Sequence, residues 1–270
     1  MRATTPPSAE QPAVRSQPGV PTVATGVGAA VGLVGTRVAL WLGVQLGLAG
    51  LLVLAGVTAT GGQVLDRVAG WWMVYAALVD LGALAVIGWL LRRDHGSYRG
   101  LLGPPTTAWQ VALGAVGVLA ASVPAVVFSA ELTGAVYGQA TPPMFAVVEV
   151  PLLASVLGVL VVPLLAELAE PVAYLGVVLP RLEERLGRPW LAATIVVVVW
   201  AAEHACYPLQ TSGGGVDLEF AAYRVGSVLP FLATWTALYH ALGRRLLPIM
   251  AARWVFNGAT AAALALGLVG

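Results

Sequence analysis

Polar side chains of chemically useful types interrupt three apolar segments in the second half of the chain. They are Glu170, His204, Arg253 and Asn257. A carboxylate, an imidazole and an amide are costly to bury in hydrocarbon, so such residues usually mark a functional site when they occur in membrane segments. These residues are therefore the candidate site.

The spacing of these residues allows them to act together. Arg253 and Asn257 are four residues apart, and Glu167 and Glu170 are three apart, so each pair shares one face of a helix. In a water-filled pocket between three helices, a carboxylate suits a general base, a histidine can help to activate water or protonate a leaving amine, and an asparagine can stabilise an oxyanion. This chemistry is hydrolysis. The alternative is that the polar residues only hold helices together through buried contacts.

The elements that position these residues are apolar runs of about 20 residues, each long enough to cross a bilayer as a helix. The 270 residues are 59% hydrophobic and 10% charged. The short alternating strands of a β-barrel are not seen in the sequence, and a net charge of +1 argues against nucleic acid as a partner. The sequence predicts an all-α fold, a polytopic integral membrane helical bundle of about seven transmembrane helices in contact with membrane lipid.

The expected spans are seven apolar segments. They cover residues 28–58, 70–91, 107–129, 144–180, 189–206, 221–242 and 246–268. The fourth is too long for one straight crossing, and we expect Pro163 and Pro171 to kink or tilt it because proline removes a helix hydrogen bond. Residues 1–23, rich in Pro, Ser and Thr, are expected to form a disordered cytoplasmic tail. Residues 24–143 then form N-terminal transmembrane helices, and residues 144–270 form a core that contains the candidate site.

The placement of arginines predicts the orientation in the membrane. Loops on one side carry most of them: Arg92, Arg93, Arg99, Arg181, Arg185, Arg188, Arg244 and Arg245. By the positive-inside rule this side is cytoplasmic, which puts the N-terminus inside and the C-terminus outside a cell membrane crossed many times. At about 1.5 Å per helical residue, Glu170 lies roughly 16 Å from the arginine-rich edge, Arg253 roughly 12 Å, Asn257 roughly 18 Å and His204 roughly 22 Å. The candidate residues thus share one depth range.

Three motifs in the core resemble those of a known family. Glu170 is followed by P-V-A-Y-L-G and then by V-V-L-P-R-L-E-E-R-L-G-R-P-W-L-A, W-A-A-E-H ends at His204, and R-W-V-F-N ends at Asn257. These motifs are similar to those of the CPBP family, the CAAX proteases and bacteriocin-processing enzymes also called the Abi family, over roughly residues 145–268. The resemblance implies an intramembrane endopeptidase of the type II CAAX-prenyl protease kind, whose substrate is a membrane-borne or lipid-modified (CAAX-like) peptide.

The resemblance is incomplete at three positions. The positions that match the family motifs are Glu170, Tyr174, Gly176, Trp200, His204 and Asn257. The positions that differ are Pro171, where the family has a second glutamate, Leu175, where it has an arginine, and Arg253, where it has a histidine. Glu167 shares the face of Glu170 and could act as the second carboxylate. Glu203 is discounted, because consecutive residues of a helix point apart.

The family roles, carried onto this chain, make Glu170 the water-activating base, with His204 and Asn257 completing the site. The family also admits a metal ion, but one histidine and one glutamate are too few ligands and a guanidinium would repel a cation, so no cofactor is expected. Arg253 could bind an oxyanion instead, or pair with Glu170 and hold it as a spent anion.

Two other functions stay open at this point. A catalytically silent protein of the CPBP fold would bind a peptide or partner without cleavage, and the replacements at Pro171, Leu175 and Arg253 favour it. A small transporter would use Asp80 and Arg37, although a buried pair between neighbouring helices is the simpler interpretation and no internal repeat suggests transporter halves. The sequence contains no signal for an oligomeric state.

Overall fold

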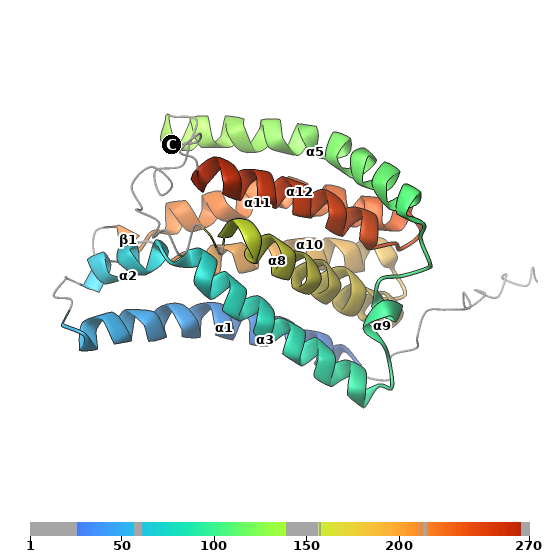
Figure 1. The fold of residues 1–270 in the computed structure, drawn as a ribbon, viewed down its shortest axis with the longest axis horizontal. Coiled ribbons are helices and arrows are strands. Elements are labelled where there is room, and N and C mark those ends of the chain that lie inside the picture. Colours follow the sequence, from blue (N-terminus) through green and yellow to red (C-terminus); the bar gives the residue numbers. More distant parts are fainter. Residues whose placement is uncertain are drawn as a thin grey trace, which may run out of the picture.

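The computed structural model describes residues 26–56, 61–138, 156, 158–209, 211–212 and 215–265. The expected tail, residues 1–23, lies outside the described residues, as does the first part of the fourth expected span. Two strands of two residues each, β1 (Thr211–Ser212) and β2 (Gly215–Val216), pair in antiparallel fashion, and the remainder of the described chain is helix and connecting turn (Figure 1). The predicted all-α fold is confirmed.

Every expected span contains a helix within the described residues. The helices are α1 (Val27–Leu54), α2 (Gly61–Ala69), α3 (Trp72–Arg93), α4 (Tyr98–Leu101), α5 (Ala108–Tyr137), α8 (Val162–Pro171), the π-helical segment η1 (Val172–Val178), α9 (Leu179–Leu186), α10 (Pro189–Glu203), the 3₁₀ turn η2 (His204–Cys206), α11 (Leu218–Ala241) and α12 (Leu247–Ala265). Among them, five helical stretches are long and apolar enough to cross a membrane: α1, α3, α5, the continuous run from α8 to α9, and α10 with η2. The helices α11 and α12 lie alongside them in the same bundle (Figure 1).

Local sequence signals explain where several helices begin and end. Thr107 starts α5 with a capping box, in which its hydroxyl accepts from the Gln110 amide at 3.3 Å and the Gln110 side chain accepts from the Thr107 amide at 3.0 Å. Gly187 ends α9 in the left-handed conformation, with φ of 61°, and Pro189 occupies the first turn of α10. These boundaries follow from side chains that satisfy helix-end groups or fit the required dihedral angles.

The two prolines of the fourth span act differently from one another. Pro163 stands in the first turn of α8, which follows a break in the helix at Val161, so it begins a helix in place of the expected kink. Pro171 closes α8 and is followed by the seven-residue π-helical segment Val172–Val178. Proline cannot donate the backbone hydrogen bond of a regular α-helical turn, and short π segments of this kind recur at functional sites.

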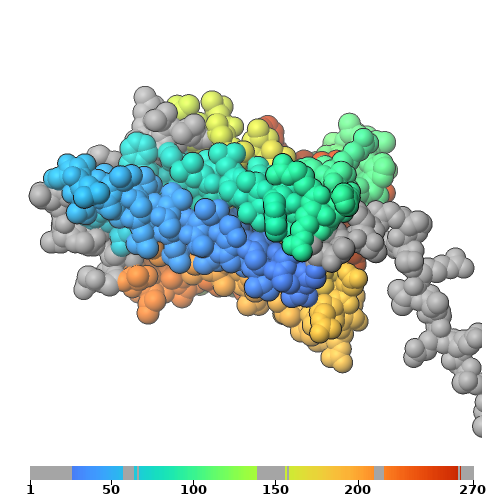
Figure 2. Space-filling view, turned by 90° about the horizontal axis from the view of Figure 1, so that it is seen from below, coloured from blue at the N-terminus to red at the C-terminus, as the bar shows by residue number. Residues whose placement is uncertain are grey.

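The run from α8 to α9 lies at the centre of the bundle. In its most apolar stretch 72% of the residues are buried, against 17% for α1 and for α5. In Figure 1 it lies between a layer formed by α1 and α3 and a layer formed by α5, α11 and α12, and Figure 2 shows α1 and α3 side by side on one face. The outer helices cover the central run, as a membrane bundle with a polar centre requires.

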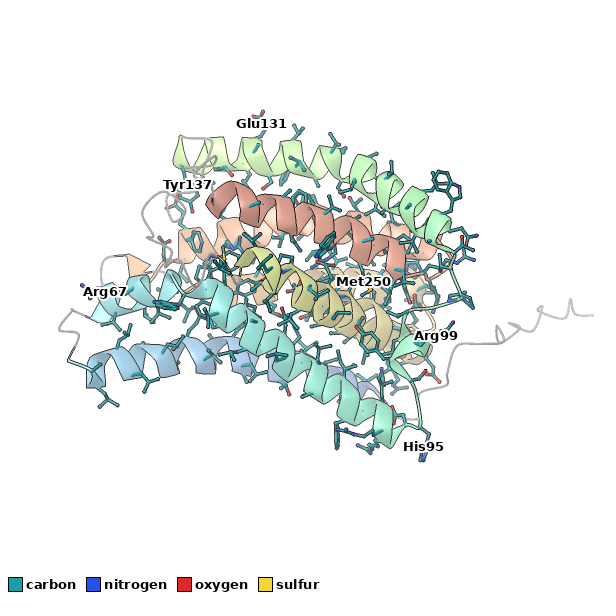
Figure 3. All side chains as sticks on the ribbon, in the orientation of Figure 1. Arg67, His95, Arg99, Glu131, Tyr137 and Met250 are labelled. Atoms are coloured by element: carbon teal, nitrogen blue, oxygen red, sulfur yellow. The ribbon has the colours of Figure 1, made fainter. Side chains whose placement is uncertain are left out.

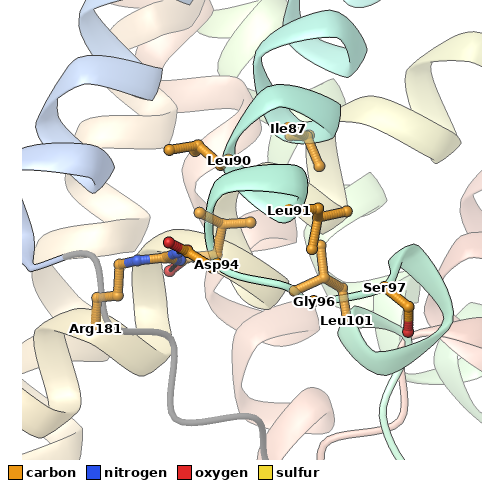
Figure 4. Close-up of a pocket in the computed structure, with 9 residues that line it drawn as sticks. Ile87, Leu90, Leu91, Asp94, Gly96, Ser97, Leu101 and Arg181 are labelled. Carbon is orange, nitrogen blue, oxygen red and sulfur yellow. Dashed lines mark hydrogen bonds and ion pairs between the residues drawn. The ribbon is translucent and has the colours of Figure 1, made fainter.

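The three arginine-rich loops meet at one end of the bundle, as predicted. Arg181 pairs with Asp94 at 3.4 Å, Arg244 pairs with Glu183 at 2.6 Å, and the Leu246 amide donates to the Leu102 carbonyl at 3.0 Å. In Figure 3, His95 and Arg99 mark this end, whereas Arg67 and Tyr137 lie at the opposite end. A cavity of about 20 Å³, beside the Asp94–Arg181 pair, opens between α3 and η1 here (Figure 4).

Candidate active site

The two glutamates of α8 meet the polar residues of α12 inside the bundle. Arg253 Nε lies 2.7 Å from Glu167 Oε2, and Arg253 Nη2 lies 2.7 Å from Glu170 Oε2. The Asn257 side-chain amide donates to Glu167 Oε1 at 2.8 Å. Glu167, Glu170 and Arg253 are all buried. The helical spacing that predicted two shared faces therefore brings these four residues together.

A second arginine enters the same cluster from α1. Arg37 Nη2 lies 3.2 Å from Glu170 Oε1 and 2.8 Å from Glu203 Oε1, and its Nη1 lies 3.1 Å from Asp80 Oδ1. Each oxygen of Glu170 is thus paired with a different guanidinium. The predicted ion pair between Arg37 and Asp80 is present. Its connection to Glu170 was not predicted.

Glu203, which the argument from helix faces discounted as a second carboxylate, is part of this cluster. It accepts from Arg37 Nε at 3.0 Å, from Trp41 Nε1 at 2.8 Å and from the Tyr174 hydroxyl. Consecutive residues of a helix do point apart, but the end of α10 is enclosed on both sides, so Glu203 and His204 are both buried. Side chains on opposite faces of this helix end can therefore both contact other parts of the protein.

His204 lies at the end of α10, where the helix tightens into a 3₁₀ turn. Its Nδ1 atom is 2.9 Å from the Trp200 carbonyl oxygen, and a carbonyl can only accept, so Nδ1 carries a proton. For Nε2 the described residues provide no hydrogen-bond partner. The imidazole therefore presents Nε2 for contact with another group, and its ring packs beside that of Tyr207 at a centroid distance of 5.1 Å.

Aromatic rings surround the ion-paired side chains of α8 and α12. The Arg253 guanidinium lies over Trp235 at 4.5 Å and over Trp200 at 5.2 Å from the ring centroids, and the rings of Trp200 and Tyr174 stack at 4.7 Å. A cation over aromatic faces is attracted by the ring quadrupole, and more strongly where water is excluded. The Arg253 guanidinium is therefore held both by the two carboxylates and by the aromatic rings. Tyr174 and Trp200, which match the family motifs, are among the rings that enclose it.

The cluster contains more acids than bases. Four buried carboxylates, Asp80, Glu167, Glu170 and Glu203, share the two guanidiniums of Arg37 and Arg253. These mutual pairs occupy the centre where the sequence predicted a water-filled pocket. Of the cavities described, the one of about 20 Å³ and a groove of about 560 Å³ between α1 and α3, neither is lined by residues of α8, α10 or α12.

The donor set of this cluster does not fit a metal ion. Within the described ranges, no group of three or more His, Cys, Asp or Glu side chains is arranged to hold one. Each carboxylate that a cation would need already accepts from a guanidinium, and a second positive charge would be repelled there.

The fold and the cluster define a multi-pass helical membrane protein with buried Glu and His side chains and a half-buried Asn257 at its centre. Residues 151–259 match the family model described as "Type II CAAX prenyl endopeptidase Rce1-like", and this part of the chain is a domain of that family. No curated protein and no solved structure gave a significant match. The matched residues include Glu167, Glu170, His204, Arg253 and Asn257, whereas Arg37 and Asp80 lie outside them. Membership in this family suggests an intramembrane endopeptidase.

Proposed function

We propose that the protein hydrolyses a peptide bond in a membrane-borne or lipid-modified (CAAX-like) peptide. The observation that carries this proposal is that Glu167, Glu170 and Asn257 are joined through Arg253 inside the family domain. His204 follows directly after Glu203, which shares Arg37 with Glu170. A carboxylate, an imidazole whose Nε2 has no hydrogen-bond partner among the described residues, and an amide donor are groups that can promote the addition of water to a carbonyl.

Each of these side chains has a role in the proposed reaction. Glu170 takes a proton from water as the water oxygen attacks the substrate carbonyl, and the proton then goes to the amine that leaves. His204 assists through Nε2, and Asn257 donates to the developing oxyanion. Glu167 orients Asn257 by accepting from its amide at 2.8 Å. Arg253 must give up its contact with Glu170 before water can approach, and the released guanidinium can then bind the oxyanion.

The proposed setting is a cell membrane, with the arginine-rich end of the bundle cytoplasmic, the N-terminus inside and the C-terminus outside. Glu170 lies eleven residues before Arg181 at that end. A site at this depth would receive a peptide from the cytoplasmic half of the bilayer.

The second candidate is a silent member of the same fold that binds a peptide or partner without cutting it. The observation in its favour is the pairing of Arg253 with Glu170 at 2.7 Å, together with Arg37 on the other oxygen at 3.2 Å. With a guanidinium on each of its oxygens, Glu170 has no oxygen left open to an incoming water.

Cleavage of a panel of lipidated and unlipidated membrane peptides by purified protein separates these two functions. We expect wild type to cut, and Glu170→Ala to lose about 10²–10⁴-fold in rate, the contribution of a positioned general base. The matched control is Glu131→Ala, which removes an exposed glutamate on the outer face of α5 (Figure 3) and should cut at the wild-type rate. If only Arg253→His cuts, the site is silenced by Arg253. If Glu170→Ala cuts as well as wild type, Glu170 is not the base.

A further inference from the structure

One face of α1 is buried although most of this helix is exposed or half-buried. Arg37, Trp41 and Gln45 follow one another at intervals of four residues, so they form one stripe along the helix. Their exposed fractions are 0%, 1% and 1%. We call these three residues the α1 stripe. Its polar atoms are directed inward, toward the centre of the bundle.

The first residue of the α1 stripe gathers acids from three other helices. Arg37 pairs with Asp80 of α3, Glu170 of α8 and Glu203 of α10, at distances from 2.8 to 3.2 Å. The planar guanidinium presents five N–H groups in a fixed fork, which a lysine cannot reproduce. Arg37 therefore orients the Glu170 carboxylate and also balances its negative charge.

The other two residues of the stripe hold the turn that carries His204. Trp41 donates to Glu203, the residue directly before His204, at 2.8 Å. Gln45 donates to the Cys206 carbonyl at 2.8 Å and accepts from the Leu209 amide at 2.8 Å. The side chain of the residue before His204 and the backbone after His204 are thus both bonded to α1.

We propose that the α1 stripe positions the two reacting groups of the site, Glu170 through Arg37 and His204 through Trp41 and Gln45. This inference rests on the proposed peptidase function. It assigns part of the catalytic geometry to a helix outside residues 151–259 of the family match. Arg37 is a positioning residue in this scheme, because it acts on substrate only through Glu170.

Stability alone is a poor explanation for this arrangement. Burying one guanidinium among three carboxylates carries a desolvation cost that often equals or exceeds the Coulombic gain, and apolar replacements of buried ion pairs are frequently as stable. The network instead determines geometry, because the rigid guanidinium of Arg37 sets the relative positions of α3, α8 and α10.

The test uses full-length protein in detergent, with Arg37→Lys and Gln45→Leu compared against Arg181→Lys. Arg181 is also buried and ion-paired, with Asp94 at 3.4 Å, but its pair lies at the arginine-rich end. Arg37→Lys retains the charge and so is expected to fold. We expect the kcat of Arg37→Lys to fall by about 10²-fold, because a shift of a reacting group by about 1 Å has an effect of this size. Its KM should stay within about twofold of wild type. Gln45→Leu should also lower kcat, and Arg181→Lys should leave kcat and KM unchanged.

A second measurement does not depend on cleavage. Melting temperatures of wild type, Arg37→Lys, Glu170→Gln and the double variant form a double-mutant cycle. If Arg37 and Glu170 are in contact, the melting temperature of the double variant should change by less than the sum of the changes in the two single variants. The same cycle with Arg181→Lys should be additive. If wild type cleaves no peptide, the proposed function fails, and this cycle alone decides whether Arg37 holds Glu170. Additive shifts, or an Arg37→Lys variant with wild-type kcat, would overturn the inference.

Discussion

At the scale of single residues, Glu170 is the side chain whose surroundings define the site. It is held by Arg37 from one side and by Arg253 from the other. The sequence has Leu175 at the position where the family motif has an arginine, yet a guanidinium still reaches Glu170, because α1 supplies it. The local motif lacks its arginine, and the guanidiniums that pair with Glu170 come from α1 and α12.

Removal of Arg253 should destabilise the folded protein strongly. Arg253→Met removes the guanidinium that pairs with Glu167 and Glu170 in a buried site. Breaking a buried ion pair in this way lowers the free energy of unfolding by about 3–5 kcal/mol. Thermal unfolding in detergent measures this effect. Arg93→Met is the control, since Arg93 is exposed at the end of α3 and surface changes stay within about 0.5 kcal/mol. Equal melting temperatures for the two variants would contradict the paired arrangement.

At the scale of elements, part of the site could be predicted from helical spacing and part could not. Glu167 with Glu170, and Arg253 with Asn257, lie on shared helix faces, and depth placed both pairs at one level. The contributions of Arg37 and Glu203 depend on which helices pack together, and the spacing of residues within a helix contains no such information. Arg37 was recognised only as a partner of Asp80, because those two residues lie on neighbouring spans.

Helix ends were predictable wherever one residue type satisfies the local geometry. Gly187 has φ of 61° and a Cβ at this position would meet no atom within 4 Å, so Gly187→Ala adds backbone strain alone, about 1–2 kcal/mol. The same substitution at Gly47, which is exposed within α1 with equally open space, should stabilise the helix by about 0.5–1 kcal/mol. Unfolding midpoints that shift in opposite directions would support both assignments, whereas a shift of the same sign would contradict the left-handed cap.

At the scale of the whole molecule, the arginine-rich loops meet at one end, so the two ends of the bundle differ in their content of positive charge. Arg99 and Arg67 are exposed at opposite ends (Figure 3). By the positive-inside rule we expect the Arg99 end to face the cytoplasm.

Labelling of single cysteines in whole cells tests this orientation. In a Cys206→Ala background, Arg67→Cys should react with a membrane-impermeant maleimide in intact cells, and Arg99→Cys should react only after permeabilisation. The two variants exchange the same residue types, so differences in labelling report on location. The reverse pattern would invert the proposed topology.

The partnering of charges also has a consequence for biosynthesis. Arg37 and Asp80 lie 43 residues apart on α1 and α3, so they can enter the bilayer as a neutralised hairpin, at less than the roughly 2.5–3.5 kcal/mol that each isolated charge costs at the helix centre. Glu167 and Glu170 instead await Arg253, which is synthesised 83 residues after Glu170. A nascent chain that stops before α12 therefore leaves both acids in the membrane without this partner.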